Sequence, residues 1–115
     1  ICDRFSDSTL AYQVYGKKLN LNFIKNIQNI ILGKLKPNLT FVLKVSSSSS
    51  SSRLKKRKSK NRYDNFPKKF YQNAQKSFIK LAKNKKNYFI LDSSQNNNHL
   101  EKKILAITSK YLKIK

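Results

Sequence analysis

A chain of 115 residues is long enough for one small domain, or a piece of one, and too short for two independently folded domains. Lysine and arginine number 26 against 5 aspartate and glutamate residues, and the formal net charge of +21 predicts an anionic partner, either a phosphate-bearing ligand or a nucleic acid. The single cysteine and single histidine, Cys2 and His99, exclude an internal disulfide and a zinc cluster built from the usual residues.

The remaining global features concern the origin of the charge and the location of the protein. Codon bias in an AT-rich genome would also enrich lysine and asparagine, so part of the charge need not serve a function. No apolar run approaches the roughly 20 residues needed to span a bilayer, and no signal segment opens the chain, which favours a soluble, cytoplasmic protein. The chain begins at Ile1 without a polar lead-in, and we expect it to be a fragment.

The first half of the chain contains three predicted elements. Apolar residues recur at helical spacing in segment 8–16 and again in segment 20–31, where Gly33 follows at a position typical of a helix end. Both segments are therefore predicted helices. Segment 39–45 (LTFVLKV) is a short, nearly continuous apolar run and is predicted to be a buried strand.

The second half begins with an abrupt change in composition. A serine tract, 46–52, is followed by a basic run, 53–62; this pair is either a linker with a solvated charged run, or the start of a helix that leads into a mobile basic loop. A helix over 66–82, a strand over 88–91 and a final helix with Leu100, Ile104, Ile107 and Tyr111 on one stripe complete the pattern. Strands that alternate with amphipathic helices predict an α/β fold with a parallel sheet, although two strands alone do not make a stable sheet.

Four ordered stretches carry the strongest functional signal. They are DRFSDSTLAYQ at 3–13, GKLKPNLTFVLKV at 33–45, NRYDNF at 61–66 followed by FYQNAQKSFIKLA, and YFILDSSQ at 88–95. In this order they resemble the bacterial-type thymidylate kinases. The resemblance implies the three-layer phosphate-loop nucleoside and nucleotide kinase fold with a parallel sheet. Residues 1–115 would form the C-terminal portion of one domain, with an acceptor-site segment at 1–16 and a lid at about 53–64.

The chain also departs from the family pattern. Asn38, Lys44 and Asn61 stand where the family usually has aspartate, and the serine tract replaces a Pro-Glu-containing helix start. The phosphate-binding motif GxxxxGK[ST] occurs nowhere in the sequence, and the family would carry it before Ile1. The resemblance therefore implies that the full-length protein phosphorylates dTMP to dTDP with ATP, and that this chain alone is inactive.

The resemblance assigns the acceptor site to the opening segment. Arg4, projected from the C-terminal end of a strand, would bind the dTMP phosphate, because a guanidinium matches phosphate oxygens in a two-point fork. Asp3 would lie near Mg²⁺ and its water shell, as an indirect metal contact with a catalytic role. An isolated Asp-Arg pair would more often be structural, and its place in the long motif reverses that preference.

The helix after Arg4 would line the thymidine pocket. The resemblance assigns Ser8, Thr9, Tyr12 and Gln13 to dTMP binding, since hydroxyl and amide groups can hydrogen-bond a pyrimidine edge and a tyrosine ring can wall the sugar. Without the motif, Tyr12 would be interpreted as ordinary helix packing. Phe5 is expected in the core or behind the pocket wall, and Cys2 is expected to be buried in the strand and inert.

The basic run resembles the lid that closes over ATP in the family. Arg57 and Arg62, with Arg53 behind them, are the candidate catalytic and ATP-binding arginines, while the intervening lysines are expected to be solvated. Taken alone, such a run would more often be a surface patch or a nucleic-acid contact. Ser94 and Gln95 match a loop that flanks the adenine, mainly through backbone contacts, and His99 is expected to face solvent.

Two function classes remain open at this point. The first is the dTMP kinase, with Mg²⁺ as cofactor, dTMP and ATP as ligands, and a homodimer expected from the family. The second is a small basic RNA- or DNA-binding protein, such as a ribosomal protein, with lysines on the phosphates and aromatic rings for stacking. The ordered motifs favour the kinase, and composition favours the nucleic-acid binder.

Overall fold

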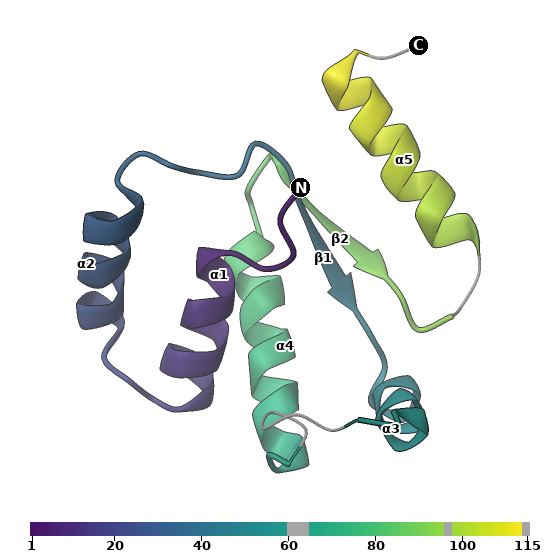
Figure 1. The fold of residues 1–115 in the computed structure, drawn as a ribbon, viewed down its shortest axis with the longest axis horizontal. Coiled ribbons are helices and arrows are strands. Elements are labelled where there is room, and N and C mark those ends of the chain that lie inside the picture. Colours follow the sequence, from purple (N-terminus) through teal and green to yellow (C-terminus); the bar gives the residue numbers. More distant parts are fainter. Residues whose placement is uncertain (60–64, 96–97, 114–115) are drawn as a thin grey trace.

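The computed structural model describes residues 1–59, 65–95 and 98–113. In chain order the elements are α1 (Ser6–Thr9), the π-helical η1 (Leu10–Gly16), α2 (Leu21–Leu32), β1 (Thr40–Lys44), α3 (Ser47–Lys56), α4 (Lys68–Ala82), β2 (Tyr88–Asp92) and α5 (Asn98–Leu112) (Figure 1). The predicted alternation of helices and strands is confirmed.

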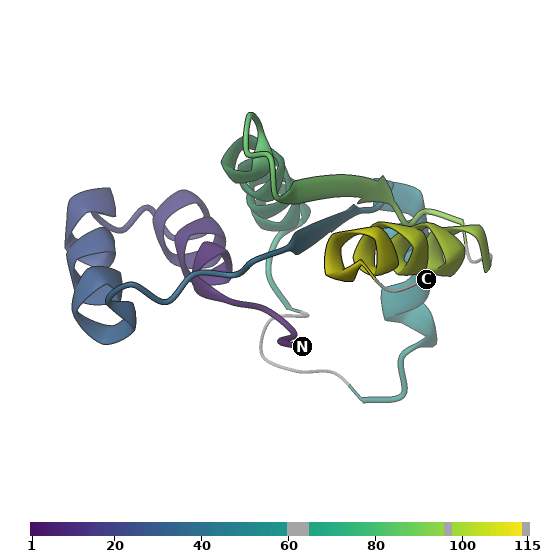
Figure 2. The same cartoon turned by 90° about the horizontal axis from the view of Figure 1, so that it is seen from above.

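The two strands form a parallel pair, as predicted. Their register runs from Thr40 opposite Tyr88 to Lys44 opposite Asp92. The chain passes from β1 to β2 through α3 and α4, and α4 contacts both strands. Seen from above, α4 and α5 lie on opposite sides of the strand pair (Figure 2). The described residues thus form an α/β arrangement with helices on both sides of a parallel sheet.

A small apolar core joins η1 to its neighbours. Leu10, Val14 and Ile24 are buried together, with Leu81 of α4 packed against them. Gly16 lies so close to α4 that a Cβ placed on it would be 2.6 Å from a ring carbon of Phe70. Glycine is therefore required for η1 and α4 to approach each other at this point.

The serine tract is helical. The prediction that the serines begin a helix is therefore confirmed, and the alternative that they form a low-complexity linker is wrong. Serine is a mediocre helix former, and α3 depends on contacts at its ends. The Ser46 hydroxyl caps the helix by accepting a hydrogen bond from the Ser49 amide at 3.2 Å, and the Ser46 amide donates to Ser94 Oγ at 2.9 Å. Near the other end, Arg53 reaches the loop after β2.

The opening segment differs from the prediction in three respects. Residues 1–5 form no strand, because they make no ladder with β1 or β2 and Arg4 adopts a left-handed φ of 71°. Cys2, predicted to be buried in that strand, is exposed, and its thiol donates to the Arg4 carbonyl at 3.0 Å. The helix begins at Ser6 rather than Ser8 and widens into η1, where the Lys17 amide donates to the Tyr12 carbonyl, five residues earlier, at 3.0 Å.

Within the described ranges, no helix combines the length and the apolar character that crossing a membrane requires.

Candidate active site

Arg4 and Tyr12 lie together at the start of the predicted acceptor site. The Arg4 guanidinium carbon lies over the Tyr12 ring, 5.3 Å from its centroid. The same ring packs against Phe70 and Phe78 of α4, with centroid separations of 5.8 and 5.9 Å. Because aromatic neighbours fix the ring and the ring attracts the cation, the exposed guanidinium has a defined position.

The other predicted acceptor residues lie on the same segment. Asp3 and Thr9 are exposed, whereas Ser8 and Gln13 are partly buried. Their described contacts are local: the Ser8 amide donates to the Phe5 carbonyl at 2.9 Å, and the Gln13 carbonyl accepts from Leu19 at 3.0 Å. The exposed Asp3 carboxylate and Thr9 hydroxyl are accessible to a ligand.

Asp7 connects this segment to the sheet. Burial, together with the hydrogen bond and the negative charge of the nearby Asp7 carboxylate, raises the pKa of Tyr88 to about 12. Gln28 of α2 adds a second connection by donating to the Ser6 carbonyl at 2.8 Å. Helix α1 is therefore held between α2 and the first residue of β2.

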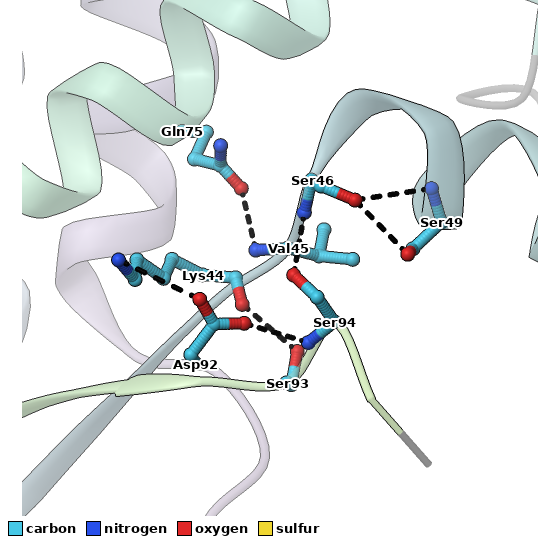
Figure 3. A network of polar contacts seen from close by, with 8 residues as sticks. All are labelled: Lys44, Val45, Ser46, Ser49, Gln75, Asp92, Ser93 and Ser94. Carbon is cyan, nitrogen blue, oxygen red and sulfur yellow. Dashed lines mark hydrogen bonds and ion pairs between the residues drawn. The ribbon is translucent and has the colours of Figure 1, made fainter.

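A polar network occupies the carboxyl ends of the two strands (Figure 3). Lys44 Nζ lies 3.6 Å from Asp92 Oδ2, and the Ser94 amide donates to Asp92 Oδ1 at 2.8 Å. Hydrogen bonds from Ser94, with a smaller contribution from Lys44, lower the pKa of the Asp92 carboxyl. Ser93 Oγ donates to the Lys44 carbonyl at 3.0 Å. The loop after β2 is thereby fixed against the end of β1.

The predicted lid is joined to this network through Arg53. Its Nη2 atom donates to the Ser93 carbonyl at 2.5 Å and lies 3.5 Å from the Ser94 carbonyl. Arg57 follows four residues later as the C-cap of α3 and is exposed, as is Gln95 in the predicted adenine loop. The structure thus brings Arg53 and Ser94 together, while the predicted lid residue Arg62 lies outside the described residues.

The sequence interpretation missed two members of the network. Gln75 of α4 accepts a hydrogen bond from the Val45 amide at 2.9 Å, which secures the turn between β1 and α3 (Figure 3). Nothing in the local pattern around Gln75 pointed to this contact, which spans 30 positions. Lys44 had a signal, since it replaces a family aspartate, and its partner Asp92 explains why a cation is accommodated there.

The described residues offer little for direct metal binding. They contain no group of three or more histidine, cysteine, aspartate and glutamate residues that could hold an ion. Asp92 already accepts from Ser94 and pairs with Lys44, whereas Asp3 is an exposed carboxylate beside Arg4. A single carboxylate fits Mg²⁺, which commonly keeps several waters and takes other ligands from substrate phosphates.

Comparison with known proteins gives a consistent result along the chain. A family profile described as thymidylate kinase matches residues 1–104. A Prochlorococcus marinus (strain AS9601) thymidylate kinase is 42% identical over 96 residues, which cover 84% of this chain and 44% of that protein. A Trichodesmium erythraeum thymidylate kinase is 35% identical over 107 residues, covering 93% of this chain and 48% of that protein. A Mycoplasmopsis pulmonis thymidylate kinase is 34% identical over 110 residues, which cover 92% of this chain and 47% of that protein.

The chain therefore spans just under half the length of these curated relatives. The profile match extends from the acceptor segment through both strands and into α5, so it includes the Arg4–Tyr12 pair and the network at the strand ends. The chain belongs to the thymidylate kinase family and has part of its phosphate-loop kinase fold.

Proposed function

We propose that the protein containing this chain phosphorylates dTMP to dTDP with ATP, and that the chain supplies the acceptor site, the lid and the loop beside the adenine. Family membership supports the reaction class. The observation that carries the assignment of the acceptor site is the contact of Arg4 with the packed ring of Tyr12. That contact orients a cation at the start of the segment that the motif assigns to dTMP.

Arg4 would bind the acceptor phosphate. A guanidinium can donate two parallel hydrogen bonds to a phosphate, and the Arg4 side chain is exposed. Thr9 and Gln13, with Ser8, would hydrogen-bond the thymidine, and Tyr12 would wall the sugar. Holding the nucleotide at both ends aligns its phosphate with the donor, which is the main requirement of phosphoryl transfer.

The donor side would be completed by the lid. Arg57 and Arg62 would approach the ATP phosphates, and closure would add positive charge where negative charge develops. Arg53 would connect the lid helix to the adenine loop, since it already donates to the Ser93 carbonyl, with Ser94 and Gln95 beside the base. Mg²⁺, when bound with ATP, would neutralise the phosphates, and Asp3 would contact its water shell.

The phosphate-binding loop would have to come from a part of the protein outside these residues. The 115 residues contain two glycines, Gly16 and Gly33, whose spacing cannot satisfy GxxxxGK[ST]. We therefore expect no dTMP kinase activity from this chain alone. A cytoplasmic homodimer is the expected setting of the full-length protein.

A coupled ADP-release assay tests the proposal on the full-length protein, with dTMP, dUMP and other monophosphates as acceptors. We expect dTMP to be preferred, and Arg4→Ala to lower kcat/KM for dTMP about 100-fold, as for loss of a charge-assisted hydrogen-bond pair of about 3 kcal/mol. The matched control is Lys102→Ala, which removes one exposed positive charge from α5. Equal activity of Arg4→Ala and Lys102→Ala would refute the acceptor-site assignment.

A further inference from the structure

The amino-terminal ends of the strands carry a second basic surface, away from the network of Figure 3. The loop before β1 and the turn before β2 meet there, as Figure 1 shows. Asn87 Nδ2 donates to the Pro37 carbonyl at 3.1 Å, and the Thr40 amide donates to the Asn87 carbonyl at 2.9 Å. These bonds hold the two connections side by side.

Exposed lysines concentrate on these two connections. The lysine edge is defined here as Lys34, Lys36, Lys83, Lys85 and Lys86, all of which are exposed. Asp92 lies at the far end of β2, and Asp7 is partly buried beside the Tyr88 hydroxyl. The lysine edge therefore keeps most of its positive charge and attracts a phosphate chain.

A shallow concavity of about 480 Å³ opens beside three of these lysines. It is lined by Ala82, Lys83, Asn84, Lys85, Lys86, Tyr88 and Ile90. The Lys85 ammonium lies 4.3 Å from the centroid of the Tyr88 ring, and Ile90 is 39% exposed. Asn84 turns the chain with a left-handed φ of 65°, which brings the flanking lysines around the opening. Lys85 thus covers one face of the Tyr88 ring, and the exposed Ile90 side chain offers apolar surface that a flat ring could cover.

We propose that the lysine edge binds single-stranded nucleic acid, with its phosphates on the lysines and one unpaired base in the concavity against Ile90, beside the Lys85–Tyr88 pair. Lysines that follow a phosphate backbone, combined with an aromatic or apolar platform for a base, are the usual components of sequence-tolerant single-strand binding. A duplex satisfies only the first component, because its bases are stacked inside the helix. This site lies at the opposite end of the strands from the network of Figure 3, and its test measures nucleic-acid binding rather than kinase activity.

Fluorescence anisotropy with a labelled oligothymidylate of about 12 nucleotides tests the site on the full chain, because single-strand sites cover roughly 4–16 nucleotides. The test variant is Lys83→Gln/Lys85→Gln/Lys86→Gln. The control, Lys102→Gln/Lys103→Gln/Lys110→Gln, removes the same charge from exposed lysines of α5. Circular dichroism and thermal unfolding establish that each variant retains the fold.

At roughly 0.1 M salt we expect the test variant to weaken binding at least about tenfold and to reduce the slope of log K against log salt by about 2, as for three lost phosphate contacts. The control should weaken binding less than about threefold and keep the slope. Equal losses in the two variants would show that binding follows total charge, and the lysine edge would then not be a site.

A second comparison separates a nucleic acid from any other phosphate chain. An abasic oligomer of the same length keeps the phosphates and lacks the base, so it should bind several-fold more weakly, because base stacking contributes about 1–3 kcal/mol. Ile90→Ser should remove much of that difference. Equal affinity for the abasic and thymidine oligomers would overturn the single-strand assignment, as would tighter binding of a duplex of equal length.

Discussion

The guanidinium of Arg4 and the ring of Tyr12 face each other at 5.3 Å, although Arg4 lies in an irregular segment and Tyr12 in a π-helix. Phe70 and Phe78 hold the ring from the other helix, so the position of Arg4 depends on the packing between η1 and α4. The side chain that we propose as the phosphate ligand is thereby supported by an aromatic cluster.

This relationship predicts different effects for two substitutions of Tyr12 in the full-length protein. Tyr12→Phe keeps the ring and should leave KM for dTMP within about twofold, whereas Tyr12→Leu should raise it about fivefold, as for loss of a cation–π contact of about 1 kcal/mol. Steady-state kinetics with varied dTMP measures both. Equal KM values for the Phe and Leu variants would mean that the ring does not orient Arg4.

The close approach of Gly16 to Phe70 predicts a stability effect in the chain itself. Gly16→Ala places a methyl group 2.6 Å from the Phe70 ring and should lower the free energy of unfolding by about 1–3 kcal/mol. Urea denaturation measures the change, and Gly16→Ala should lower the free energy of unfolding less in a Phe70→Leu background than it does with Phe70 present. If the two substitutions have additive effects, the close contact does not limit the packing.

The serine helix predicts opposite effects for two chemically identical substitutions. Ser46→Ala removes the cap of α3 and should cost about 1 kcal/mol. Ser51→Ala, at an exposed interior position of the same helix, should stabilise it by about 0.5 kcal/mol, because alanine has the higher helix propensity. Hydrogen exchange of α3 amides distinguishes the variants: unchanged exchange in Ser46→Ala would contradict the capping role, and faster exchange in Ser51→Ala would contradict the propensity argument.

The lowered pKa of Asp92 predicts that its carboxylate contributes to the stability of the fold at acid pH. The hydrogen bonds from Ser94 lower the pKa of the folded Asp92 carboxyl below the usual 3.8. The contribution of ionised Asp92 to folding stability is therefore complete above pH 3.8 and is lost as the pH falls through the lowered pKa. Asp92→Asn should therefore flatten the stability profile at the acid end while leaving its shape near neutral pH unchanged. Unfolding free energies measured across that range, with Asp3→Asn as control, test this; an unchanged acid limb in the Asp92 variant would contradict it.

The raised pKa of Tyr88 predicts a loss of folding stability at alkaline pH. The pKa of Tyr88 is raised from 10.0 to about 12. The contribution of the protonated Tyr88 hydroxyl to folding stability is therefore present below pH 10 and is lost as the pH rises toward 12. Asp7→Asn removes the negative charge beside the hydroxyl and should move the tyrosinate titration of Tyr88 to lower pH, with Tyr88→Phe identifying the signal. An unchanged Tyr88 titration in Asp7→Asn would show that Asp7 does not raise the pKa of Tyr88 and that burial alone accounts for the shift.

Local periodicity was sufficient to predict most elements, because helix and strand patterns are set by neighbouring residues. The predicted helix at 20–31 is observed as Leu21–Leu32, and the predicted strand at 39–45 as Thr40–Lys44. The helix of the acceptor segment begins two residues earlier than predicted, and its π-helical turn, whose Gly16 lies close to Phe70, follows no simple local pattern. The strand expected before Arg4 was wrong, because a strand requires a neighbour with which to form a ladder.

The candidate site was only partly predictable for a similar reason. The motif located Arg4 and Tyr12 on one segment, but their contact depends on the position of α4. Gln75 and Arg53 act across 30 and 40 positions of sequence, and no local signal encodes such pairings. Residues that we propose to recognise ligands stand out in the sequence, whereas those that position the loops do not.

Calorimetric binding of dTMP and of thymidine to the full-length protein tests most directly whether Arg4 binds the phosphate of the acceptor nucleotide. Arg4→Ala should weaken dTMP binding about 100-fold, as for about 3 kcal/mol of charge-assisted hydrogen bonding, and should leave thymidine binding unchanged. Equal weakening of both ligands, or of neither, would contradict the account.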